Sequence, residues 1–189
     1  MHKKRRASLC NNAFMKLLAF AIVFFAASVT FHAQAVTSVY TPLDHKKCKT
    51  LELTDEEGGS YKGLCPGTAG YKLHLIEGDL RQTITIIDPK GKEHPLQFWN
   101  LTGAFNAVGE TAEWRMRGKK PIALIVRLTV NERVDDPAYV KGYLVVAKIT
   151  PQVTCVTEFL APTRSHNYEA RKAADKSATR PCRFESTPD

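Results

Sequence analysis

The chain has 189 residues, with 27 Lys and Arg against 19 Asp and Glu, and a formal net charge of +8. Five basic residues and no acidic ones lie in the first 35 positions, so the remaining 154 residues carry 22 basic and 19 acidic side chains. This weak net charge of +3, spread along 154 residues, gives little of the concentrated positive field that nucleic-acid binding requires. A chain of about 150 residues can bury one hydrophobic core, which predicts a single domain.

The first 35 residues predict an export signal. Basic residues at positions 3–6 precede an uncharged apolar run, Leu17–Val29. A membrane-spanning helix takes about 20 apolar residues and a signal peptide only about 7 to 15, so this run of 13 residues fits the signal. The small residues of Ala33-Gln34-Ala35 predict cleavage after Ala35. Two alternatives stay open: an uncleaved membrane anchor, and a start of translation at Met15.

Four cysteines remain after the predicted cleavage, Cys48, Cys65, Cys155 and Cys182. An even number of cysteines in an exported chain predicts two disulfides, for which three pairings are possible. We favour Cys48 with Cys65 and Cys155 with Cys182, because each pair closes a short loop, and expect about 3 to 4 kcal/mol from each bond. The chain has no C-x-x-C pair and no histidine at ligand spacing, so neither a zinc site nor a dithiol redox centre is expected.

The chain after the leader predicts short strands separated by turns. Pro121–Val130 and Tyr143–Ile149 are its most apolar and β-branched segments, which predicts strands buried on both faces. Ala112–Arg117 alternates apolar and charged residues, which predicts a half-buried strand. Asn100–Gly109 is predicted to be a loop. The other expected strands are Val39–Leu43, Cys48–Leu53, Ser60–Cys65, Tyr71–Ile76, Thr83–Ile87, Leu96–Trp99 and Val153–Leu160.

One segment near the C-terminus, 165–178, predicts a helix. Its alanines repeat at helical spacing, Ser165 or Asn167 can cap it, and Pro181 follows it. The predicted fold is therefore mainly β, an antiparallel sheet of sandwich or barrel-like form with one C-terminal α-helix and two disulfides. A single domain is expected over residues 36–189.

Several motifs run through most of the chain after the leader. They are Tyr40-Thr41-x-Leu43-Asp44 with Cys48, Glu56-Glu57-Gly58-Gly59-Ser60, Cys65-Pro66-Gly67 with Gly70-Tyr71, Glu77–Arg81, Glu113-Trp114-Arg115, Gly142–Lys148, and Asn167-x-Glu169-Ala170-Arg171 with Ala173-Ala174-Asp175 and Cys182. Together they resemble a family of exported bacterial proteins with no assigned function. The resemblance implies a bacterial, periplasmic setting and one domain with a C-terminal helix. It brings no catalytic residues.

Local signatures of catalysis are missing from the sequence: there is no nucleophile elbow, phosphate-binding glycine loop or zinc-binding histidine pair. His74 is isolated, and its alternation with two leucines places it on the polar face of a strand. The carboxylate-rich segments 55–57 and 131–136 lack the calcium-loop pattern and are interpreted as solvated turns. No catalytic residue, metal or cofactor is therefore predicted.

A group of cations is the candidate binding site. The group is Arg81, Arg115, Arg117, Lys119 and Lys120, with Tyr71 or Trp99 as an exposed aromatic neighbour. If two strands bring these cations to one face, they form a site for an acidic protein or an envelope polyanion. The alternative interpretation is that they keep the wet face of a half-buried strand soluble.

We therefore expect a periplasmic or secreted, non-catalytic binding or inhibitor-like module. Its partner is an envelope or extracellular protein or a polyanion, not a nucleic acid, and it meets a membrane only through the export signal. One alternative is an envelope-associated hydrolase whose site, such as Asp79, His74 and a hydroxyl group, assembles from distant residues. A structural envelope component is the other.

Overall fold

The computed structural model describes residues 34–55, 58–133 and 135–184. The chain divides into two units, Met1–Ala33 and Gln34–Asp189, and the described residues all belong to the second. The predicted export signal, residues 1–35, lies almost entirely outside the described residues. None of the helices in the described ranges is long and apolar enough to cross a membrane.

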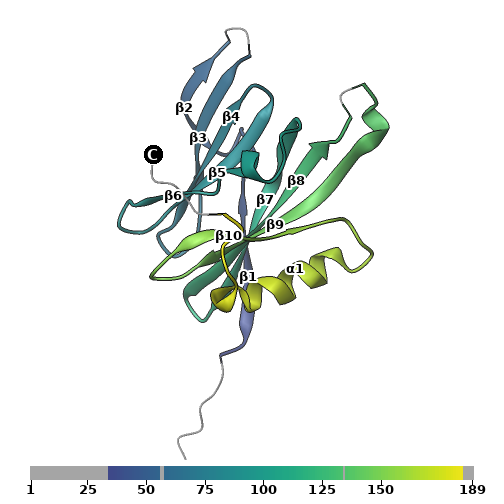
Figure 1. Ribbon diagram of the computed structural model, residues 1–189. Helices are drawn as coiled ribbons and strands as arrows, with labels where there is room; N and C mark the ends of the chain where they lie inside the picture. Colours follow the sequence, from purple (N-terminus) through teal and green to yellow (C-terminus); the bar gives the residue numbers. More distant parts are fainter. Residues whose placement is uncertain (1–33, 56–57, 134, 185–189) are drawn as a thin grey trace, which may run out of the picture. The chain divides into compact units, whose positions relative to one another are not determined.

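Ten strands of the described chain form one sheet (Figure 1). They are β1 (Val36–Pro42), β2 (Lys49–Thr54), β3 (Ser60–Pro66), β4 (Lys72–Gly78), β5 (Arg81–Ile87), β6 (Glu93–Pro95), β7 (Asn106–Arg117), β8 (Lys120–Asn131), β9 (Val140–Ile149) and β10 (Thr154–Leu160). The helix α1 (His166–Asp175) follows the last strand, and three single 3₁₀ turns are η1 (Phe98–Asn100), η2 (Pro137–Tyr139) and η3 (Ser177–Thr179).

The sheet runs in the order β10-β9-β8-β7-β5-β4-β3-β2, with β1 added to β7 and β6 added to β5. Its strand pairs are antiparallel except for one parallel bridge between β5 and β7, at Arg81 and Asn106. Residues 111–117 of the same edge of β7 pair with β1. Among the described residues, strand pairing therefore joins the β2–β6 half to the β7–β10 half only at the start of β7. The prediction of a mainly β fold is confirmed, and the sheet is open and mixed.

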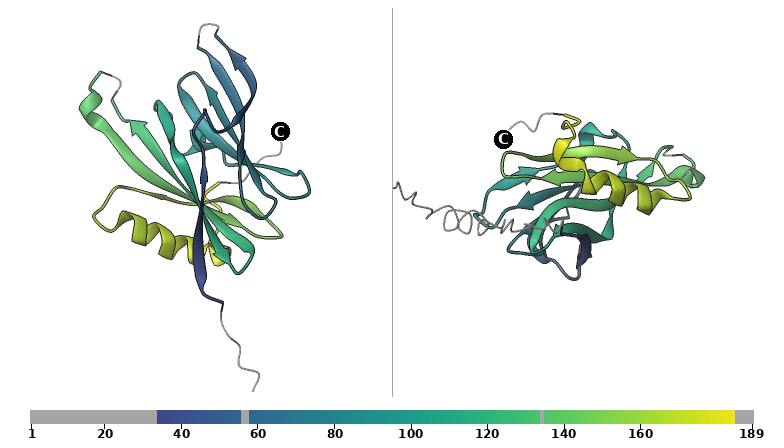
Figure 2. Two further views of the ribbon diagram at one scale, coloured as in Figure 1. Left: turned by 180° about the vertical axis from the view of Figure 1, so that it is seen from behind. Right: turned by 90° about the horizontal axis from the view of Figure 1, so that it is seen from below.

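The main core lies between the two halves of the sheet. Alternate residues of β8 and β9 face it, and they pack there with buried side chains of β3, β4, β5 and β7. The other face of β8 and β9 carries a smaller cluster that receives Ala170 and Ala174 of α1. The helix thus lies on the opposite face from the main core (Figures 1 and 2). Both strands are buried on both faces, as their continuous apolar sequence predicts.

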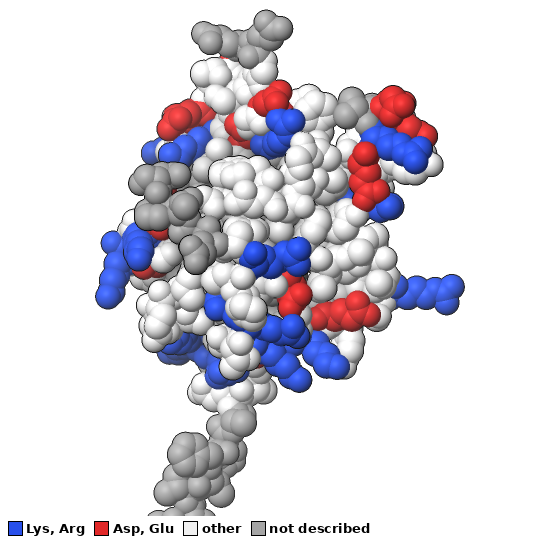
Figure 3. All heavy atoms as spheres, in the orientation of Figure 1, with Lys and Arg blue, Asp and Glu red and all other residues white. Residues whose placement is uncertain are grey.

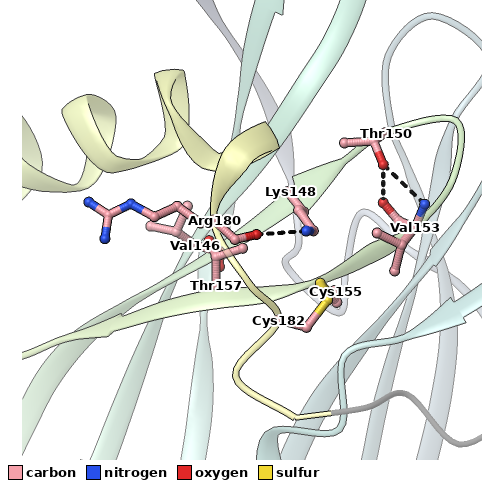
Figure 4. The surroundings of a disulfide bond; sticks show 8 residues. All are labelled: Val146, Lys148, Thr150, Val153, Cys155, Thr157, Arg180 and Cys182. Carbon is pink, nitrogen blue, oxygen red and sulfur yellow. Dashed lines mark hydrogen bonds between the residues drawn. A yellow bond between two sulfur atoms is a disulfide. The ribbon is translucent and has the colours of Figure 1, made fainter.

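The two predicted disulfides are present, Cys48–Cys65 and Cys155–Cys182. The second ties the C-terminal segment to β10 (Figure 4). Beside it, the Lys148 ammonium donates to the carbonyl of Arg180 at 2.7 Å. The amide of Arg183 donates to the carbonyl of Val156 at 2.9 Å. Two disulfides are consistent with an oxidising, extracytoplasmic environment.

Three predicted elements are corrected. Leu96–Trp99 is not a strand, because Gln97 has a left-handed backbone with φ of 47° and the chain turns into η1. The buried hydroxyl of Thr83, which accepts from the Phe98 amide at 3.0 Å, holds that turn. The loop expected over 100–109 is shorter, because β7 begins at Asn106. The helix is shorter than 165–178, because its last turn becomes the 3₁₀ turn η3.

Candidate anion-binding site

The structure separates the cations predicted to form a site. Arg81 starts β5 opposite Asn106 at the start of β7 and donates to the Gly103 carbonyl at 3.0 Å. Arg115 lies nine residues further along β7, about 25 to 30 Å away at the rise of an extended strand. Its guanidinium is buried against α1, where it pairs with Asp175. Arg81 and Arg115 therefore do not lie together in one site.

Arg117 and Lys119 are placed differently. Arg117 ends β7, Lys119 lies in the turn between β7 and β8, and Lys120 starts β8; all three are exposed. Arg117 and Lys120 line the same cavity. This part of the predicted group stays together, at one end of the sheet.

Antiparallel pairing collects several turns at this end. The turns at 67–71, 88–92, 118–119 and 150–153 connect β3 to β4, β5 to β6, β7 to β8 and β9 to β10. Neighbouring antiparallel strands run in opposite directions, so every second connection falls at the same end. These turns lie toward the lower left of Figure 1.

Three adjoining cavities open among these turns. The first, of about 480 Å³, lies along the Pro66–Lys72 connection. The second, of about 370 Å³, lies between the 88–92 and 150–153 turns and shares Tyr71 with the first. The third, of about 420 Å³, shares Lys120 with the second and continues toward the end of α1. Together they make a hollowed surface of the size that ligand sites require.

The cavities are lined by cations that we name the basic end. These are Lys47, Lys49, Lys72, Lys90, Lys92, Arg117 and Lys120. Within the described ranges none of them takes part in an ion pair, whereas arginines elsewhere, such as Arg115, Arg171 and Arg180, do. The basic end therefore keeps its charge available for an external anion.

Two carboxylates, Asp88 and Asp175, line the cavities, and both are engaged locally. Asp88 accepts from the backbone amides of Lys90 at 2.8 Å and Lys92 at 2.9 Å, and lies 3.6 Å from the His94 ring. Burial alone would raise its pKa, but the hydrogen bonds from Lys92 and Lys90 and the contact with His94 lower the pKa of Asp88 below its usual value. Asp175 is held by Arg115. Neither carboxylate pairs with a lysine ammonium of the basic end.

The opposite end of the sheet has a different charge balance. Asp55, Asp79, Glu132, Asp135 and Asp136 lie in or beside its turns. In Figure 3 the acidic side chains are concentrated in the upper part of the molecule, while Lys and Arg predominate in the lower part. On the face seen in Figure 3, cations therefore predominate toward the lower end of the strands, which favours the approach of an anion there.

Tyr71 stands at the junction of the first two cavities. Its ring lies 5.9 Å from that of Trp114 in the core, which anchors its apolar part. Burial, and then the charge of Asp88, raise the pKa of Tyr71, so the phenol stays neutral. Gly67 lets the chain fold closely here, because a Cβ at that position would lie 2.3 Å from the Tyr71 carbonyl oxygen.

The residues named for a hydrolase do not assemble. His74 is buried in β4, on the opposite face from Leu73 and Leu75, with its Nδ1 3.5 Å from Glu93. Asp79 lies beyond the end of that strand and pairs with Arg81. No group of three or more His, Cys, Asp or Glu that could hold a metal ion occurs among the residues the structure describes.

Comparison with protein-family models, with curated proteins and with solved structures finds no match to this chain. The site therefore rests on geometry. Five of the lysines at the basic end were not predicted from the sequence to belong to a site: Lys47, Lys49, Lys72, Lys90 and Lys92. A usable signal was present, because each lies in a turn or beside a strand end, and alternate turns of an antiparallel sheet meet.

Proposed function

We propose that this protein is an exported, periplasmic or secreted binding module, without catalytic activity, that binds a polyanion of the envelope or extracellular space through its basic end. The observation that carries the proposal is the set of seven cations around three adjoining cavities, none in an ion pair with another described residue. The two disulfides and the leader sequence support the location.

The composition of the basic end favours a polyanion over an acidic protein. Protein interfaces are enriched in aromatic residues and Arg and depleted of Lys, especially at their centre. The basic end has the reverse composition, with six lysines and one arginine. An ammonium group is a compact point charge, which suits separate anionic groups along a chain.

The experiment measures binding of the disulfide-bonded protein to heparin, a highly charged probe. The variant Lys90→Gln/Lys92→Gln/Lys120→Gln should lose about tenfold in affinity, because three ammonium groups leave the site. The control Lys62→Gln/Arg164→Gln/Lys172→Gln removes the same charge from positions outside the cavities of the basic end. Its affinity should change by less than about twofold, because exposed charges beyond a Debye length are screened.

Raising the salt from about 0.05 M to about 0.5 M should weaken binding strongly for an electrostatic site. Equal losses in both triple variants would mean that net charge alone attracts the probe and that the basic end is not a site. Absence of binding by the folded, oxidised protein at low salt would refute the proposed function.

A further inference from the structure

The second cavity of the basic end, which we name the Tyr71 pocket, lies between the 88–92 and 150–153 turns and measures about 370 Å³. Its volume falls within the range of small-molecule sites, so it is large enough for one ring of a ligand and too small for a folded partner. A polyanion that crosses the basic end would place one of its units in this pocket.

The walls of the pocket are fixed before any ligand arrives. The Thr150 hydroxyl donates to the Val153 carbonyl at 2.7 Å and accepts from the Val153 amide at 3.0 Å (Figure 4). On the other side, the amide of Gly91 donates to the carbonyl of Asp88 at 2.9 Å. Such preorganisation lowers the entropy lost on binding.

Several kinds of polar group line the pocket. The Asp88 carboxylate is among them, but it is already held by the amides of Lys90 and Lys92 and lies 3.6 Å from His94, which also lines the pocket. Lys90, Lys92 and Lys120 supply ammonium groups with no ion-pair partner in the described ranges. The neutral Tyr71 hydroxyl and the Gln152 amide make no hydrogen bond to another described side chain. Ammonium groups bind an acid group, while a phenol and an amide can exchange hydrogen bonds with hydroxyl groups.

The remaining walls are apolar. Pro89, Ile149 and Pro151 line the pocket between the polar groups. Pro89 is held against the backbone at Gly70, where a Cβ would come within 3.3 Å of the proline ring. A ligand that uses the whole pocket needs an acid group, several hydroxyl groups and a face of C–H groups.

We infer that the Tyr71 pocket binds one unit of an acidic saccharide, a sugar ring that carries a carboxylate, sulfate or phosphate group. The lysines hold the acid group, Tyr71 and Gln152 contact the ring hydroxyls, and the prolines cover the apolar face of the ring. This inference rests on the proposed function and specifies its ligand. A nucleic acid is disfavoured, because base stacking needs open aromatic faces. Apart from the imidazole of His94, the aromatic ring that lines this pocket is that of Tyr71, and it packs towards Trp114.

The test compares four probes by calorimetry with the disulfide-bonded protein. Tetragalacturonate carries carboxylates, a heparin tetrasaccharide carries mainly sulfates, maltotetraose is a neutral sugar, and inorganic polyphosphate is a polyanion without a sugar. The variants are Tyr71→Phe and Gln152→Ala, each of which removes one hydrogen-bonding group, with Tyr168→Phe on the exposed face of α1 as the control. Gln152 lies in an exposed turn, so its variant keeps the fold.

At least one acidic tetrasaccharide should bind more tightly than maltotetraose. Its affinity should fall about tenfold in each pocket variant, as expected for a lost hydrogen bond to a buried or half-buried partner. Polyphosphate affinity should be unchanged in these variants, and Tyr168→Phe should alter neither. The tetrasaccharide whose affinity falls in the pocket variants identifies the acid group, carboxylate or sulfate, that the pocket binds.

If both tetrasaccharides bind and neither pocket variant weakens them, the basic end binds charge alone and the saccharide inference is wrong. The saccharide inference is also wrong if polyphosphate binds and no saccharide does, but in that case the proposed function stands. If no polyanion binds, the proposed function itself fails.

Discussion

The guanidinium of Arg115 holds the carboxylate of Asp175 with two parallel hydrogen bonds, from Nε to Oδ1 at 2.7 Å and from Nη2 to Oδ2 at 2.9 Å. Arg115 comes from β7 and Asp175 ends α1, so the pair fixes the last turn of the helix on the sheet. Nearby, Arg171 of the same helix donates to Glu113 of β7 at 2.7 Å. The polar face of β7 is therefore a helix-docking surface.

Asp175→Asn should destabilise the protein by about 2 to 3 kcal/mol, because among the described residues it leaves the buried Arg115 guanidinium with only one carboxylate contact, the longer one to Glu113 at 3.6 Å. Chemical unfolding at neutral pH measures the loss. The control is Glu158→Gln, which removes the partner of the half-exposed Arg180 and should cost less than about 1 kcal/mol. Equal effects of the two amide substitutions would show that the bidentate pair does not anchor α1.

Gly63 makes room for a buried ring. A Cβ at this position would lie 2.1 Å from the Tyr61 hydroxyl oxygen and 2.6 Å from Cζ, so Gly63→Ala must displace the ring. Tyr61 is buried and stacks on His45 with ring centroids 4.3 Å apart. We expect a loss of about 2 to 3 kcal/mol in the free energy of unfolding, the range for overpacking a core.

Gly103→Ala is the matched control for that change, because a Cβ at Gly103 meets no atom within 4 Å and the backbone there is not left-handed. It should change stability by less than about 0.5 kcal/mol. In a Tyr61→Leu background, Gly63→Ala should also become nearly neutral. A large loss that persists in that background would assign the effect to the backbone and not to the ring.

The sequence predicted those parts of the fold that depend on neighbouring residues. The continuous apolar runs of β8 and β9 reveal burial on both faces, and alternation places Trp114 and Arg115 on opposite faces of β7. Short loops between cysteines favoured the pairing that is present, because a close sequence neighbour is also the nearer partner in space.

Features that depend on distant residues were not predictable. Alternation could not show that α1 covers Arg115, because its partner Asp175 lies 60 residues away. Leu96–Trp99 has the composition of a strand, yet the Thr83 hydroxyl bonds the Phe98 amide and a turn forms instead. The basic end likewise exists only after four separate turns meet at one end of the sheet.

The Cys155–Cys182 disulfide should hold the C-terminal segment on β10. It closes a loop with a sequence separation of 27, and the double variant Cys155→Ala/Cys182→Ala should lose about 3 to 4 kcal/mol by the loop-entropy estimate. The amide of Arg183, which donates to Val156 at 2.9 Å, should then exchange its hydrogen rapidly.

The companion variant Cys48→Ala/Cys65→Ala opens a loop with a separation of 17 and should cost about 3 kcal/mol. In this variant the Arg183 amide should still exchange only on global unfolding. The Cys48–Cys65 disulfide joins the residue before β2 to β3 and does not hold the C-terminal segment. Rapid exchange at Arg183 in both double variants would mean that the second disulfide has no specific role in holding the segment.

His74 should make stability depend on pH. The residue is 7% exposed, and its Nδ1 has no hydrogen-bond partner among the described residues although Glu93 lies at 3.5 Å. Burial lowers the pKa of His74, and the positive charge of Lys62 lowers it further. The negative charges of Glu93 and Glu52 raise it but do not cancel the effect of burial. The folded state therefore binds a proton less readily than the unfolded chain, whose histidine titrates near 6.5.

Below a pH of about 6.5 the unfolded state gains a proton at His74 before the folded state does, so the stability contributed by the neutral ring is lost as the pH falls. His74→Gln cannot titrate, and its free energy of unfolding should fall less between pH 7.5 and about 5.5 than that of the parent protein. The difference between the two proteins isolates His74 from the carboxylates, which titrate in both. Parallel curves over this range would show that His74 is protonated equally in the folded and unfolded states.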